Sequence, residues 1–128
     1  MLFGHLALAR RLGFEPTLDP RTRLLATQHA AELSGCRWCI ERGRHDWRCA
    51  RLPPILLRHL RDYATCPFFD QRERTALAFI EAASRCEAQS DAVAESVLAE
   101  ARRFFTEGEI AELVRCLADH HFLDDSIP

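Results

Sequence analysis

Hydrophobic residues recur at helical spacing along most of the chain, and no run alternates apolar and polar residues between turn signals. The pattern therefore predicts helices and no strands. A first helix is predicted from Pro20 to Ser34, because Asp19 provides a capping carboxylate before a proline at the first helical position. Gly35 is expected to break or bend the chain. A second helix is predicted from near Cys36 to near Cys49.

Capping residues and prolines place four further helices along the rest of the chain. Two prolines after Leu52 end the second helix and open the next one. Acceptors followed three residues later by Glu form capping boxes before two of the later helices. The expected ranges are 55–63, from Asp70 to near Arg85, from Ser90 through Ala101, and from Thr106 through Leu117 to a tail that frays from Asp124.

These segments predict an all-α protein, built as a compact bundle of about six helices joined by short loops and without a sheet. The chain has 128 residues, of which 48% are hydrophobic. This length and composition suit one domain with a single core across residues 1–128.

The net charge and the distribution of basic residues indicate which kinds of partner are not expected. The net charge is -2, and the basic residues are all Arg and are spread along the whole chain, so no nucleic-acid partner is expected. The apolar part of the first eleven residues is too short to span a membrane, and its charges follow it rather than precede it, unlike those of a secretory signal. We therefore expect a cytoplasmic protein with no membrane partner.

Cys36 and Cys39 form a C-x-x-C pair at the start of a predicted helix. A helix turns by about 100° per residue, so the two side chains lie about 60° apart on one face, close enough for a disulfide. Unpaired backbone N–H groups and the positive end of the helix dipole stabilise a thiolate there. Arg37 adds a positive charge, and Trp38 offers bulk to cover the sulfurs or to anchor the turn in the core. Such a pair in a reducing compartment indicates redox chemistry or a metal.

Two other interpretations of these cysteines compete with redox chemistry. Two cysteines on an apolar helix face can be simple packing. A zinc site is a second alternative, because His45 and Cys49 follow the pair with ligand-like composition. On a continuous helix, however, they fall about 180° and 220° around from Cys36, so no metal is predicted. The remaining cysteines are interpreted as core or incidental residues: Cys66, Cys86 and Cys116.

Three segments resemble the superfamily of carboxymuconolactone decarboxylases and AhpD-like alkylhydroperoxidases. They are residues 33–41, which contain the cysteine pair, and residues 69–79 and 105–113. They come in the family's order and spacing, and the resemblance covers most of the chain from Arg21 to His121. The resemblance implies an all-α fold that assembles into homo-oligomers, commonly trimers or hexamers. For the AhpD-type members it also implies a thiol peroxidase, in which Cys39 attacks the peroxide and Cys36 closes the disulfide.

The chain departs from the AhpD pattern at two positions. The family places a His four residues after the second cysteine, where this chain has Gly43, and a Glu about twelve residues before the first, where it has Leu24. A general acid or base typically contributes a factor of about 10² to 10⁴, so a weak peroxidase is expected. Glu32 is the preferred substitute for the base, because it is the ionisable group nearest the pair in sequence. Other candidates are Gln28, His29 and His45.

Two functions are therefore weighed. The first is a thiol-dependent oxidoreductase that reduces a small peroxide through a reversible disulfide between Cys36 and Cys39, is restored by a cellular dithiol and uses no cofactor. The alternative is a non-redox enzyme, either a decarboxylase or a lactone-processing enzyme, or a catalytically weak oligomeric binding protein. The vicinal pair favours redox chemistry, since the decarboxylase branch does not need it.

Overall fold

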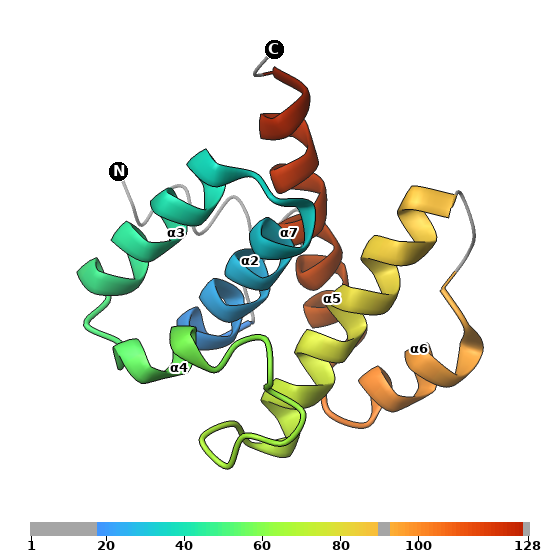
Figure 1. The fold of residues 1–128 in the computed structure, drawn as a ribbon. Coiled ribbons are helices and arrows are strands. Elements are labelled where there is room, and N and C mark those ends of the chain that lie inside the picture. The colour runs from blue at the N-terminus through green and yellow to red at the C-terminus, as the bar shows by residue number, and fades with distance from the viewer. Residues whose placement is uncertain (1–17, 90–92, 127–128) are drawn as a thin grey trace, which may run out of the picture.

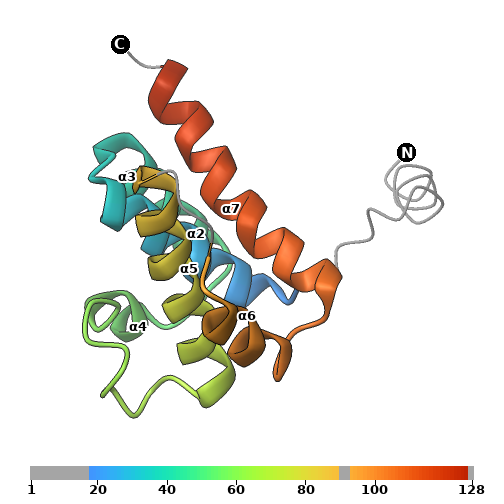
Figure 2. The same cartoon turned by 90° about the vertical axis from the view of Figure 1, so that its right-hand side faces the viewer.

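The computed structural model describes residues 18–89 and 93–126, and within these ranges the chain forms six helices and no strand (Figure 1). The all-α bundle predicted from the sequence is confirmed. Helix α2 lies at the centre and packs against α3, α5 and α7, while α5 also packs against α6 (Figure 1). Helix α7 runs along one side of the bundle (Figure 2). The helices are α2 (Pro20–Ser34), α3 (Arg37–Cys49), α4 (Pro54–Arg58), α5 (Gln71–Gln89), α6 (Glu95–Arg102) and α7 (Glu107–Ser126).

Two large hydrophobic clusters hold the helices together. The first joins α2 and α5 to α6 and α7, with Phe79, Ile80 and Leu113 fully buried in it. The second joins α2 and α5 to α3 and α4 around Trp47, whose indole N–H donates to the Pro53 carbonyl oxygen at 2.9 Å. Because α2 contributes to both clusters, its position fixes the helix α3 that carries the cysteine pair.

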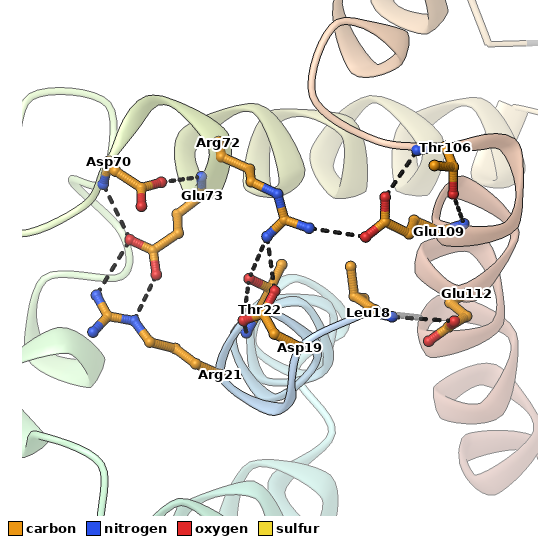
Figure 3. A network of polar contacts seen from close by, with 10 residues as sticks. All are labelled: Leu18, Asp19, Arg21, Thr22, Asp70, Arg72, Glu73, Thr106, Glu109 and Glu112. Carbon is orange, nitrogen blue, oxygen red and sulfur yellow. Dashed lines mark hydrogen bonds and ion pairs between the residues drawn. The ribbon is translucent and has the colours of Figure 1, made fainter. Parts of the chain in front are cut away.

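The N-termini of α2, α5 and α7 meet in a network of polar contacts (Figure 3). Arg72 donates to Asp19 at 2.7 Å and to Glu109 at 3.0 Å, and its guanidinium lies 4.4 Å from the centre of the Phe105 ring. Burial alone would raise the pKa of the Asp19 carboxyl, but hydrogen bonds from Arg72 and from Thr22 outweigh it and hold that pKa below its usual value. One arginine on α5 therefore links the N-terminal cap residue of α2 to the first turn of α7.

An ion pair and two capping boxes complete this network. Glu73 is buried and accepts hydrogen bonds from the Arg21 guanidinium and from the backbone N–H of Asp70, whose carboxylate in turn accepts from the N–H of Glu73 at 2.7 Å. This is the capping box predicted at the start of α5. Thr106 and Glu109 form the one predicted before α7, with reciprocal bonds of 2.9 and 3.1 Å.

Four helix boundaries differ from the sequence-based expectation. The helix expected over 55–63 ends at Arg58, and the backbone then turns so that Leu60 and Tyr63 both enter the second cluster. Helix α5 continues past Arg85 to Gln89, and α7 is helical through Ser126. Helix α6 begins at Glu95, after the extended residue Ala94, whereas Ser90, expected to cap it, lies outside the described residues.

We predict that Arg72→Leu lowers the free energy of unfolding by about 2 kcal/mol, because it leaves Asp19 and the mostly buried carboxylate of Glu109 without their shared cation. Urea denaturation followed by circular dichroism measures this change. Arg103→Leu is the matched control, since the pair of Arg103 with Glu100 is exposed, and it should cost less than about 1 kcal/mol. Equal losses in the two variants would contradict the role given to Arg72.

Candidate functional site

The turn at Gly35 places the cysteine pair. Gly35 has a φ of 74°, and its N–H donates to the carbonyl oxygens of Ala31 and Glu32 at 3.0 and 3.3 Å, which ends α2. Glycine adopts this left-handed conformation without the steric penalty that a Cβ brings. The break expected at Gly35 is confirmed, and the chain starts α3 two residues later.

Cys36 is the N-cap residue of α3, and Cys39 lies in the first turn of that helix. The structure joins them by a disulfide, with their Cα atoms 5.3 Å apart. The sulfur of Cys36 also accepts a hydrogen bond from the backbone N–H of Cys39 at 3.3 Å. The sequence-based prediction that the two sulfurs lie on one side of the first turn, close enough to bond, is confirmed.

Cys36 and Cys39 are both almost fully buried. Cys36 is 8% exposed and Cys39 is 9% exposed, and they pack against Ala31 and Ile40 in a small cluster of their own. Trp38, between them, is 47% exposed, and the Arg42 guanidinium lies 5.5 Å from the centre of its ring. The indole therefore does not anchor the turn in the core, which corrects one of the two roles expected for it.

Glu32 lies on the last turn of α2 and is partly buried. Burial raises the pKa of its carboxyl, and the charges of Arg61 and Arg44 oppose this rise without cancelling it. With His29, Leu33, Arg61 and Glu81 it lines a cavity of about 250 Å³. Among the described contacts, Glu32 makes no hydrogen bond to either sulfur, so any proton exchange with the pair requires a side-chain movement or a water.

His29, another candidate for the base, is buried. Its Nε2 lies 3.1 Å from Glu81, which also accepts from the Tyr63 hydroxyl at 3.0 Å, and the His29 and Tyr63 rings meet edge to face at 5.4 Å. Burial lowers the pKa of His29 although the Glu81 charge opposes it, and burial with the Glu81 hydrogen bond raises the pKa of Tyr63. This cluster is directed at α5, and none of the described contacts joins His29 to either cysteine.

Gln28 fills the space beside Gly43, the position at which the family has a His according to the resemblance. A Cβ built on Gly43 would lie 1.6 Å from Gln28 Oε1. Gln28 is 1% exposed, and its Nε2 donates to the Ile40 carbonyl oxygen at 3.2 Å, whereas its Oε1 is buried with no hydrogen-bond partner. Leu24, at the expected Glu position, packs against the second hydrophobic cluster. The sequence does not reveal this substitution, because it depends on how α2 packs on α3.

The other cysteines lie away from this arrangement. Cys66 and Cys116 are buried in the hydrophobic clusters, Cys86 is partly exposed, and Cys49 is exposed. Cys49 Sγ lies 3.5 Å from His45 Nε2 on the exposed part of α3. Within the part of the chain that the structure describes, no group of three or more His, Cys, Asp or Glu side chains is placed to hold a metal. The same residues contain no helix long and apolar enough to cross a membrane.

Comparison with known proteins agrees with this architecture. No protein-family model and no curated protein matches the chain. A solved structure does match: a protein of unknown function from Agrobacterium tumefaciens, proposed to be the antioxidant defence protein AhpD. The two superpose with a TM-score of 0.76 and 16% sequence identity, over 95% of this chain and 82% of the other. The chain has an AhpD-like fold. Within it, the cysteine pair lies at the start of α3, and Gln28 lies where the resemblance expects a His.

We predict that Gly43→Ala lowers the free energy of unfolding by about 1 to 3 kcal/mol, because its methyl group overlaps the buried Gln28 amide. Adding Gln28→Ala should recover much of this loss in a double-mutant cycle measured by urea denaturation. Gly108→Ala, at an exposed helical position of α7, is the control and should be neutral or stabilising. Additive effects of Gly43→Ala and Gln28→Ala would show that the two residues do not touch.

The raised pKa of Glu32 predicts that its charge destabilises the fold. The folded chain holds this proton more tightly than the unfolded chain, so the stability present at low pH is lost as pH rises from the unfolded value of 4.5 through the folded pKa. Glu32→Gln should therefore raise the free energy of unfolding at pH 7, and the gain should shrink at pH 4. Denaturant titrations at both pH values test this, with the exposed Glu41→Gln as control. A loss of stability at pH 7 would contradict the assignment.

Proposed function

We propose that the protein is a thiol-dependent oxidoreductase that reduces a small peroxide through the reversible Cys36–Cys39 disulfide. The observation that carries this proposal is the disulfide itself, formed at the amide-rich end of α3. A thiolate there is stabilised by the helix dipole and by an N–H donor, which is the environment that makes cysteines reactive. The AhpD-like fold and the proposed antioxidant role of the Agrobacterium protein support the same chemistry.

The proposed cycle transfers two electrons from a cellular dithiol to the peroxide. A thiolate of the pair attacks the terminal oxygen of the peroxide, which breaks the O–O bond and gives a sulfenic acid and an alkoxide that takes up a proton as an alcohol. The second thiol attacks the sulfenic sulfur, loses its proton and expels water, which leaves the disulfide. A cellular dithiol then donates two electrons and two protons by thiol–disulfide exchange.

Glu32 is the residue that we propose as the proton carrier for this cycle. Its raised pKa keeps a fraction of the carboxyl protonated closer to neutral pH than an ordinary glutamate, so it can both give and take a proton. Neither cysteine is among the residues that line the cavity of about 250 Å³ beside Glu32, so this role requires a side-chain movement or a water between the carboxyl and the pair. Because both cysteines are about nine-tenths buried, a compact peroxide suits the site better than a bulky one.

Turnover is expected to be slow. The Gln28 amide that fills the space above Gly43 does not exchange protons near neutral pH, unlike the imidazole that the resemblance places there. The presence of Gln28 in place of an imidazole also supports the alternative, a catalytically weak binding protein. Assembly into a trimer or hexamer, the use of a cellular dithiol and the cytoplasmic location stay predictions of the sequence.

The test is peroxide consumption by the reduced full-length chain with dithiothreitol as the dithiol. Cys36→Ser and Cys39→Ser should each lower turnover by at least about tenfold, because either change prevents the disulfide. Cys49→Ser, an exposed thiol on the same helix, should leave turnover unchanged. If the wild type and both variants consume peroxide no faster than dithiothreitol alone, the redox function is wrong and the non-catalytic alternative is favoured.

A further inference from the structure

The two sulfurs of the pair lie in different electrostatic surroundings. Cys36 is the N-cap residue, and its sulfur already accepts the backbone N–H of Cys39 at 3.3 Å. In the reduced chain the same geometry directs an N–H donor and the positive end of α3 at the Cys36 sulfur, and both favour its thiolate over its thiol. The N–H of Cys39 is used in this bond, and the next one, from Ile40, donates to the Cys36 carbonyl oxygen at 3.0 Å. Of these two N–H groups, the one from Cys39 therefore faces the Cys36 sulfur, and the one from Ile40 is used by the helix backbone.

Gln28 packs one turn beyond Cys39. Its side chain carries no charge that could stabilise a thiolate on Cys39. Gln28 covers Gly43, which lies four residues after Cys39 on the same face of α3. Its orientation is fixed, because the Ile40 carbonyl oxygen is an acceptor and so must face the Nε2 donor at 3.2 Å. The oxygen of Gln28 is then left buried on the other side with no partner. This neutral amide offers no positive charge to a thiolate on Cys39.

The charged residues near the pair do not single out Cys39 as the thiolate. Arg37 is exposed and lies between the two cysteines in sequence, so its charge does not by itself distinguish the two sulfurs. On α2, burial raises the pKa of Glu32, and the charges of Arg61 and Arg44 oppose this rise without cancelling it. With a Gly at position 43 and a Leu at position 24, neither family position provides a base for Cys39.

From these observations we propose that Cys36, not Cys39, carries the thiolate of the reduced pair and is the sulfur that attacks the peroxide. This rests on the proposed function and reverses the roles that the resemblance implies. Cys36 sulfur takes the terminal peroxide oxygen to become a sulfenic acid. Cys39 then gives up its thiol proton, forms the S–S bond and expels water. In the reductive half, a dithiol attacks the Cys39 sulfur and the Cys36 thiolate leaves, since the thiolate of lower pKa leaves faster.

The first experiment needs no peroxide. Reduced full-length chain carrying Cys49→Ser is treated with limiting iodoacetamide at pH 7, and the alkylated peptides are quantified by mass spectrometry. Cys36 should be alkylated about tenfold faster than Cys39, because the thiolate, which is the reactive form, is stabilised at the N-cap sulfur. Equal labelling, or faster labelling of Cys39, would overturn the assignment of the thiolate.

The second experiment assigns the attacking sulfur. In the Cys49→Ser background, Cys36→Ser and Cys39→Ser are each given one equivalent of hydrogen peroxide with dimedone, which traps sulfenic acids. Ser is itself a good N-cap, so Cys36→Ser should fold, and circular dichroism checks this. Trapping should be about tenfold faster at Cys36 in the Cys39→Ser variant than at Cys39 in the other, and the opposite order would refute the proposal. If alkylation favours Cys36 but neither variant forms a sulfenic acid, the thiolate assignment stands and the peroxidase function fails.

Discussion

The left-handed turn at Gly35 is the constraint on which the site depends. It ends α2 with two hydrogen bonds to that helix and lets the chain re-enter a helix at Arg37, which leaves Cys36 as the cap. Any residue with a Cβ would be strained at a φ of 74°. Because the cap residue lies outside the helical backbone and its third successor lies inside the first turn, the two sulfurs face each other without distortion of α3.

Helix α2 connects this turn to the rest of the fold. At its N-terminus the helix is held by Asp19 and Arg72, and at its C-terminus by the Gly35 turn. Between these ends it contributes Gln28 to the packing on α3 and His29 to the buried cluster with Glu81 on α5. Helix α2 therefore positions the disulfide, places Gln28 against Gly43 on α3, and joins this region to α5.

The sequence predicted the elements that depend on neighbouring residues. Asp19 before a proline, the Gly35 break and the capping boxes at Asp70 and Thr106 act within three or four residues, and each is found as expected. The spacing of Cys36 and Cys39 predicted their disulfide for the same reason. By contrast, the end of α4 depends on the burial of Leu60 and Tyr63 in a core built by other helices, and no local signal marks it.

Contacts between distant segments were beyond the sequence pattern. His29 and Glu81 lie 52 residues apart, so the burial of His29 could not be read from its neighbours. The position of Gln28 over Gly43 also depends on the packing of α2 on α3, although a glycine within a predicted helix is a signal that another group approaches closely. In this AhpD-like fold, the Gln28 amide therefore fills the space at Gly43, one turn beyond Cys39.

The reversibility of the disulfide is the central claim, and a redox titration tests it most directly. The full-length chain is equilibrated in buffers of reduced and oxidised dithiothreitol, quenched with acid and alkylated, and the peptide that contains residues 36 and 39 is weighed. We expect one two-electron transition in which both thiols of this peptide appear together, while the thiols of the other four cysteines stay alkylated throughout. A pair that remains two free thiols under fully oxidising conditions, or that forms bonds to other cysteines instead, would contradict the account.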